Sequence, residues 1–290
     1  MKTTKGLLEH GRFRVPFRRY GDHPDVLLCV SGALQTMAVW RSVARRFASN
    51  LSVVVFDMPG VGRAEITSGP THVTVDEQLD VVDALLRTSP PTGRLTLAGS
   101  SWGSAIATAF AARWPERVDQ LVLSSFGMKP NAEMARVVGR AGELYLSRNY
   151  AAGADLLLEM IGQRIGDAYK RQIVAQFASL TDETATSFYE HCRNVLTLDS
   201  LQTSVDLSRI SARTLIVNGA EDRIIDLEDM WTAQALIPDC ECRLVPEVGH
   251  FLHFERPELL DDYEAFILAG LAPQGDPATV SSRNAKRASS

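Results

Sequence analysis

The sequence has few cysteines, no long apolar run and no excess of positive charge. Its 290 residues include four cysteines, 30 Lys and Arg against 35 Asp and Glu, and a net charge of −5. The cysteines lack metal-ligand spacing, so we expect neither a zinc site nor structural disulfides. An acidic balance argues against nucleic acid as a partner. No stretch approaches the roughly 18 apolar residues that span a bilayer, so no membrane span is expected.

The first residues, MKTTKGLLEHGRFRV, have neither the apolar core nor the small-residue cleavage site of a signal peptide. Together with the reduced cysteines, this pattern predicts a cytoplasmic protein.

Short apolar runs alternate along the chain with longer amphipathic patterns. Runs that are apolar on both faces and bounded by Gly, Pro or Asp are typical of a parallel sheet covered by helices. They predict strands at 25–32, 51–57, 94–100, 120–126, 213–219 and 242–248, and helices at 37–48, 75–88, 102–113, 226–236 and 257–271. The sequence therefore predicts an α/β fold with a mostly parallel central sheet flanked by helices.

The alternation stops between residues 127 and 207, where several amphipathic helices are predicted and no strand. The segment is too long for a loop in a compact domain. We interpret it as a helical cap inserted before the strand at 213–219, over the sheet edge where α/β folds bind ligands. The predicted core is then 1–126 and 208–272. The polar end, 273–290, is expected to be disordered.

The strongest chemical motif is Gly99-Ser100-Ser101-Trp102-Gly103. It matches G-x-S-x-G and lies between a predicted strand and a predicted helix, which is the context of a nucleophile elbow. The central serine occupies a strained turn, so the positions two before and two after it must lack bulk. This register selects Ser101 as the nucleophile.

A serine needs a positioned base and an orienting carboxylate. Of the six histidines, only His250 lies in a loop directly after a late strand, with His253 as the local alternative. Glu221 and Asp222 follow the strand at 213–219, and the spacing favours Asp222. His191, in the predicted cap, could touch substrate, although a helix-surface position is the simpler interpretation.

An oxyanion hole would complete such a site. One donor is the backbone N–H of Trp102, which directly follows the nucleophile. The second is assigned by position to the backbone N–H of Ala33, with Leu34 as the nearest alternative. Nothing in the sequence calls for a metal or a cofactor, and none is expected.

These residues together resemble the α/β-hydrolase superfamily, in which the order is nucleophile, acid, histidine. A closer resemblance covers CVSGALQT, VVVFDMPGVG, SSWGSA, VVGRAGELYL, FASL, NVLTLDS, VNGAED and VGHFL. These stretches are similar to one bacterial subgroup. It contains the synthase of 3-(3-hydroxyalkanoyloxy)alkanoic acid, the lipid precursor of rhamnolipids, and a 3-hydroxyacyl-ACP:CoA transacylase of polyhydroxyalkanoate supply.

The resemblance implies that Ser101 takes a 3-hydroxyacyl group from an acyl carrier protein or CoA thioester and passes it to the hydroxyl of a second 3-hydroxyacyl group. Transfer to CoA, and hydrolysis by an esterase or lactonase, are the alternatives with the same nucleophile. A non-catalytic binding protein is the alternative of another class. Apolar side chains of the cap would line an acyl tunnel. The candidates are Leu156, Met160 and Phe177, with Leu34 and Phe251 beside the nucleophile and the histidine.

Overall fold

The computed structural model describes residues 2–197 and 201–271, which build one mixed sheet. Its strands are β1 (Thr3–His10), β2 (Phe13–Tyr20), β3 (Val26–Val30), β4 (Ser52–Phe56), β5 (Glu65–Ile66), β6 (Leu95–Ser100), β7 (Gln120–Ser124), β8 (Arg213–Gly219) and β9 (Cys240–Val245). The strand order is β1-β2-β4-β3-β6-β7-β8-β9, and β5 pairs with β2. From β4 to β9 neighbouring strands run parallel, whereas β1 and β2 are antiparallel to their neighbours.

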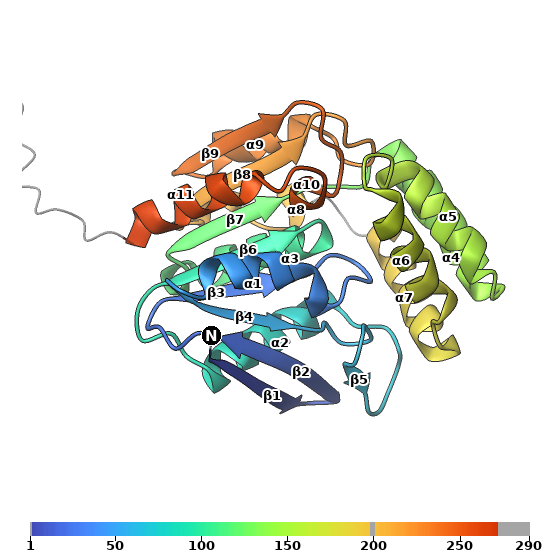
Figure 1. Cartoon of the computed structure of the whole chain (residues 1–290), viewed down its shortest axis with the longest axis horizontal. Coiled ribbons are helices and arrows are strands. Elements are labelled where there is room, and N and C mark those ends of the chain that lie inside the picture. Colours follow the sequence, from blue (N-terminus) through green and yellow to red (C-terminus); the bar gives the residue numbers. More distant parts are fainter. Residues whose placement is uncertain (1, 198–200, 272–290) are drawn as a thin grey trace, which may run out of the picture.

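Helices cover both faces of the sheet (Figure 1). In that view α1 (Arg41–Phe47) and α11 (Leu259–Leu271) lie in front of the sheet, and α2 (Val75–Thr88), α3 (Trp102–Arg113) and α9 (Glu228–Leu236) lie behind it. The position of β3 at the centre of the sheet explains why its sequence is apolar throughout. Leu28 packs in the core under α2 and α3, and Leu27 packs in the core under α1 and α11. A central strand thus buries alternate side chains in two cores.

The sequence did not predict the β1–β2 hairpin. In β2, buried positions alternate with exposed or half-buried ones that include Arg14 and Arg18, so the strand lacks a continuous apolar run. Gly11 makes the turn with φ 55°, a conformation that glycine adopts at little cost. A strand solvated on one face carries a weaker signal than a buried parallel strand.

The cap consists of helices that lie between β7 and β8 in the chain. These are α4 (Ala132–Leu146), α5 (Tyr150–Ile161), α6 (Asp167–Ala178) and α7 (Asp182–Thr197), followed by the short α8 (Leu201–Ser204). Figure 1 shows α4 to α7 beside the ends of the strands. Tyr145 is buried at their centre, with its ring centroid 4.9 Å from that of Phe188 and 5.9 Å from that of Phe177.

The predicted fold class is therefore confirmed: a mostly parallel sheet, flanked by helices, with a helical insert before β8. The division into core and cap domains stays a prediction, and the tail at 273–290 lies outside the described residues. Within the described ranges, no helix combines the length and the apolar character that crossing a membrane requires.

Candidate active site

Ser101 lies in the turn between β6 and α3, with φ 53° and ψ −123°. A non-glycine residue in such a region carries strain on the order of 1–3 kcal/mol. Backbone contacts hold the turn. The Ser101 N–H donates to the Ser124 carbonyl (2.8 Å), and the Ser101 carbonyl accepts from the N–H of Ser104 (2.8 Å) and from its hydroxyl (2.6 Å). The turn is therefore fixed on both sides of Ser101.

The two glycines of the motif are required by close backbone approach. A Cβ at Gly99 would lie 2.3 Å from the Gly103 carbonyl oxygen, and a Cβ at Gly103 would lie 2.2 Å from the Val30 carbonyl oxygen. Both distances are far below van der Waals contact. Any larger residue would push α3 away from the sheet and displace Ser101.

The structure brings Ser101, Asp222 and His250 together. Nδ1 of His250 lies 2.7 Å from Oδ2 of Asp222, and Nε2 lies 3.0 Å from Oγ of Ser101. A carboxylate can only accept, so Nδ1 carries the proton and Nε2 of the neutral ring is free to accept from the Ser101 hydroxyl. Asp222 comes from the loop after β8 and His250 from the loop after β9.

The pKa of His250 is raised above its ordinary value of 6.5. Burial of the ring acts in the opposite direction, but the charge of Asp222, its hydrogen bond to Nδ1 and the charge of Glu255 together outweigh it. Asp222 itself is buried, and its second oxygen accepts from the Ile224 N–H (3.2 Å). Asp222 and Glu255 therefore stabilise the protonated form of the His250 ring relative to the neutral form.

Two supporting residues were not found from the sequence. The Ser125 hydroxyl donates to the carbonyl of His250 (2.6 Å). The Glu255 carboxylate accepts from the N–H groups of Gly249 (2.6 Å) and Phe251 (2.9 Å), which flank the histidine. These contacts hold the backbone of the histidine loop. Backbone partners leave no residue-type pattern, although an acidic residue five positions after His250 was visible.

The other candidate histidines lie outside the hydrogen-bonded series, although His191 lines a hollow whose wall also includes Ser101. His253 is buried and stacks on Trp40 at 6.2 Å, and burial lowers its pKa to about 4 despite an opposing bond to Val39. His191 of α7 meets the Trp102 ring edge-on at 4.9 Å. Burial, with a smaller effect of His72, lowers the pKa of His191 to about 4. Its buried Nε2 has no hydrogen-bond partner in the described part of the chain.

The loop after β3 lies against Ser101. A Cβ at Gly32 would lie 3.2 Å from the Ser101 Cβ, and the Gly32 N–H donates to the Gln35 side chain (3.0 Å). Leu34 has φ 58°, which closes the turn. Ala33 thus lies in a loop that touches the nucleophile. Trp102 is the first residue of α3, and the first N–H groups of a helix have no intrahelical acceptor.

A hollow of about 180 Å³ lies between the cap and the core, with Ser101 and His250 in its wall. We call it the cap hollow. Leu34, Phe177 and Phe251 line it, as do Leu157, Leu158 and Ile161 of α5. Leu156 and Met160 are not among its lining residues. Met160 is buried within the cap, and Leu156 packs against the cluster around Tyr145. On α5, Leu157, Leu158 and Ile161 thus line the cap hollow in place of the candidates Leu156 and Met160.

A larger hollow of about 570 Å³ also reaches Ser101 and follows α3 along its length. We call it the α3 groove. Its floor includes Ala105, Ala109 and Ala112, and one wall is the segment from His72 to Leu79. It shares Ser101, Trp102, Met134 and Val195 with the cap hollow, so the two hollows meet at the candidate nucleophile.

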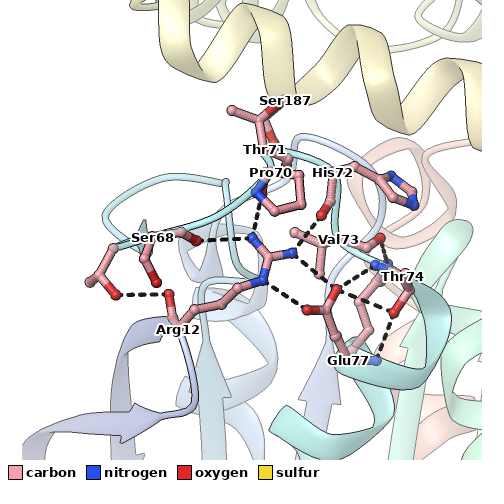
Figure 2. Close-up of polar contacts among 11 residues, drawn as sticks. Arg12, Ser68, Pro70, Thr71, His72, Val73, Thr74, Glu77 and Ser187 are labelled. Atoms are coloured by element: carbon pink, nitrogen blue, oxygen red, sulfur yellow. Dashed lines mark hydrogen bonds and ion pairs between the residues drawn. The ribbon is translucent and has the colours of Figure 1, made fainter.

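One side chain holds the loop that leads into this wall (Figure 2). The Arg12 guanidinium donates to the carbonyls of Ser68 (3.5 Å), Pro70 and His72 (2.6 Å) and to both oxygens of Glu77 (2.8 and 3.0 Å). The Glu77 carboxylate also accepts from the Thr74 N–H (2.9 Å) and so completes a capping box at the start of α2. The groove wall is therefore fixed to the turn between β1 and β2.

The acid-bearing loop is also tied to the cap. Arg164, between α5 and α6, pairs with Glu221 at 2.6 Å, so Glu221 binds the cap rather than His250. The Asn131 side chain at the start of α4 donates to the Arg223 carbonyl (2.9 Å). The position of Asp222 is thereby linked to the placement of the cap helices.

Residues 25–257 match the family described as alpha/beta hydrolase fold, and the chain belongs to this family. It is 22% identical over 277 residues to an (R)-3-hydroxydecanoyl-ACP:CoA transacylase of Pseudomonas aeruginosa, covering 94% of this chain and 92% of the relative. It is 28% identical over 251 residues to a 2-hydroxy-6-oxo-2,4-heptadienoate hydrolase of Pseudomonas putida, covering 81% and 84%.

Solved structures agree on the fold. An esterase of Thermogutta terrifontis superposes with a TM-score of 0.77 at 20% identity, over 94% of this chain and all of that one. The enzyme MGS-M2, from a deep-sea metagenome library, superposes with a TM-score of 0.79 at 18% identity, over 93% and 98%. The chain is an α/β-hydrolase-fold enzyme, either a hydrolase or an acyltransferase.

Proposed function

We propose that the chain is an acyltransferase that takes a 3-hydroxyacyl group from a carrier thioester onto Ser101. The observation that carries this proposal is the hydrogen-bonded series from Asp222 through His250 to a strained Ser101. Such a series supplies a nucleophile, a base and an orienting carboxylate.

In the first half-reaction Ser101 Oγ attacks the thioester carbonyl carbon, while Nε2 of His250 takes the hydroxyl proton. The oxyanion would accept hydrogen bonds from the backbone N–H groups of Trp102 and Ala33. The carbon–sulfur bond then breaks, the proton passes from His250 to the leaving thiol, and an acyl ester of Ser101 remains. In the second half-reaction His250 removes the proton of the acceptor, which attacks that ester. The bond from the acyl carbon to Oγ then breaks, and the proton passes from His250 to Oγ to restore the Ser101 hydroxyl.

The acyl donor is proposed from two observations. The relatives named as (R)-3-hydroxydecanoyl-ACP:CoA transacylases align with 91% or more of this chain. The apolar cap hollow beside Ser101 suits an alkyl chain, because each methylene buried there contributes about 0.8 kcal/mol. Both support a medium-chain 3-hydroxyacyl group carried by acyl carrier protein or CoA.

The acceptor is proposed to be the thiol of CoA, since that is the transfer the names of these relatives describe. This reverses the order favoured by the sequence, which placed the 3-hydroxyl of a second acyl group first and the rhamnolipid precursor as product. Hydrolysis is the second candidate, favoured by the relatives named as hydrolases, of which one is 28% identical.

Product analysis separates these outcomes. The chain is incubated with 3-hydroxydecanoyl acyl carrier protein and CoA, and the products are identified by mass spectrometry. We expect 3-hydroxydecanoyl-CoA, absent with Ser101→Ala. An ester-linked dimer would assign the hydroxyl as acceptor, and free acid alone would assign a hydrolase.

A further inference from the structure

Two hollows meet at Ser101, and a carrier thioester has two arms to place. When a thioester carbonyl carbon is bound next to Ser101, the acyl chain extends from that carbon in one direction. The sulfur and its carrier arm extend from it in the other direction. The apolar cap hollow suits the acyl chain, so the α3 groove is left for the thiol arm. We propose that the α3 groove binds the 4′-phosphopantetheine arm that acyl carrier protein and CoA share. The inference rests on the proposed function and adds a site to it.

The lining of the groove suits an arm that alternates methylene and amide groups. Ala105, Ala109 and Ala112 give it an apolar floor, and Thr74 and Asp206 place polar side chains beside that floor. The cap hollow, in contrast, is bounded on its α5 side by Leu157, Leu158 and Ile161. An arm with amides loses less hydration free energy in the mixed groove than in the apolar hollow.

The length of the groove also fits. Its lining on α3 begins at Trp102, next to the nucleophile, and continues to Arg113 at the end of the helix. At a rise of 1.5 Å per residue, the twelve steps from Ser101 to Arg113 span roughly 18 Å. That distance is comparable with an extended 4′-phosphopantetheine arm.

The far end of the groove carries two arginines, as a phosphate requires. Arg113, which pairs with Asp76, and Arg209, after α8, both line it. Arg209 is exposed, and the described residues give it no ion-pair partner. An arginine guanidinium can bind a phosphate through two hydrogen bonds at once. Arg209 is therefore the principal phosphate ligand in the proposal.

One groove can serve both half-reactions. The thiol of acyl carrier protein leaves along it, and the thiol of CoA then enters along the same path to attack the acyl ester. This arrangement predicts ping-pong kinetics, with each carrier competing for the free enzyme.

Binding is measured first, by calorimetry of the full chain with Ser101→Ala and CoA as the probe. We expect saturable binding that holo acyl carrier protein displaces. Arg209→Ala should weaken CoA binding on the order of tenfold, the loss of one charge-assisted contact to phosphate. Lys5→Ala, an exposed cation of β1, is the matched control and should bind CoA as before. Absence of CoA binding, or equal weakening by both variants, would overturn the proposal.

Turnover is then compared for decanoyl-CoA and decanoyl N-acetylcysteamine, which lacks the phosphate end of the arm. Arg209→Ala should lower the ratio of the two kcat/KM values roughly tenfold. Ala109→Leu, which adds volume to the floor, should lower kcat/KM for both thioesters, whereas Ala151→Leu on the exposed side of α5 should not.

The outcomes separate the two proposals. If the wild type uses both thioesters and Arg209→Ala leaves their ratio unchanged, the groove assignment is wrong and the acyltransferase stands. If Ala109→Leu changes the preferred acyl-chain length instead, the groove holds the acyl chain. A wild type that cleaves simple esters but no thioester removes both proposals.

Discussion

The hydroxyl of Ser125 donates a 2.6 Å hydrogen bond to the backbone carbonyl of His250. Ser125 follows β7 with φ 51°, and its own N–H donates to the Val217 carbonyl in β8 (3.1 Å). The end of β7 is thereby joined both to the neighbouring strand and to the histidine loop. Ser125 is buried, and we expect it to act through the position of His250.

Ser125→Ala should therefore reduce kcat without a comparable change in KM. Loss of the hydroxyl leaves the His250 carbonyl without this donor and frees the loop, for which we expect a decrease of about tenfold. Steady-state kinetics with a chromogenic decanoyl ester measure the change. Ser211→Ala is the control, because the Ser211 hydroxyl also donates to a backbone carbonyl, that of Pro115 (2.9 Å), but on the exposed surface. Equal effects of the two variants would contradict a positioning role for Ser125.

Asp222→Asn should shift the pH dependence as well as the rate. The carboxylate is the main group that raises the pKa of His250, so its removal leaves burial to lower that pKa. The acidic limb of kcat/KM, which lies above pH 6.5 in the wild type because the base must be neutral, should move to lower pH. The rate should fall on the order of 10³- to 10⁴-fold, because the amide no longer fixes the tautomer.

Glu221→Gln is the matched control for this change. Glu221 adjoins Asp222 but pairs with Arg164 at the surface, so the acidic limb should stay in place. If Glu221→Gln moved the limb and Asp222→Asn did not, the acid would be the other carboxylate.

Leu157→Trp should shorten the preferred acyl chain. Leu157 lines the cap hollow, and an indole there takes space from the terminal methylenes. Each methylene excluded costs about 0.8 kcal/mol, or roughly fourfold in kcat/KM. A series of p-nitrophenyl esters from butyrate to dodecanoate measures the preference. Leu146→Trp, at an exposed leucine of α4, should leave the series unchanged. A preference that follows Leu146 rather than Leu157 would place the acyl chain elsewhere.

Arg12→Ala should destabilise the fold and reduce the pH dependence of its free energy of unfolding at acidic pH. The Arg12 side chain, with the Thr74 contacts, lowers the pKa of Glu77 from 4.5 to about 2. A carboxyl whose pKa is lower in the folded state stabilises the protein above pH 4.5, and this contribution is lost as the pH falls toward 2. We expect a loss of about 2 kcal/mol at pH 7 and a smaller pH dependence in this window.

Urea unfolding at several pH values measures both effects. Arg12→Lys should recover only part of the loss, because an ammonium cannot replace the fork that binds the carboxylate and the loop. Arg14→Ala, two residues along in β2, removes only exposed ion pairs with Glu9 and Glu65 and should change stability by less than about 0.5 kcal/mol. An Arg14→Ala loss as large as that of Arg12→Ala would contradict the account.

The sequence predicted most of the sheet because buried parallel strands are apolar on both faces, as in β3 and β4. It also predicted which loops meet, since the carboxyl ends of parallel strands share one edge. It did not predict which face of α5 lines the cap hollow. Leu156 and Leu157 are adjacent and equally apolar, and only the packing of the cap decides that Leu157 lines the hollow. Ser125 and Glu255 were missed because they bind backbone atoms.

The central claim is that Ser101 carries the acyl group, and intact-protein mass spectrometry tests it most directly. The protein is mixed with 3-hydroxydecanoyl-CoA, the reaction is quenched in acid within seconds, and the mass of the intact protein is measured. We expect an increase by the mass of one 3-hydroxydecanoyl group, located by peptide mapping to Ser101, lost on addition of CoA and absent in Ser101→Ala. Turnover of the thioester without such an adduct in wild type, or an unchanged adduct in Ser101→Ala, would contradict the account.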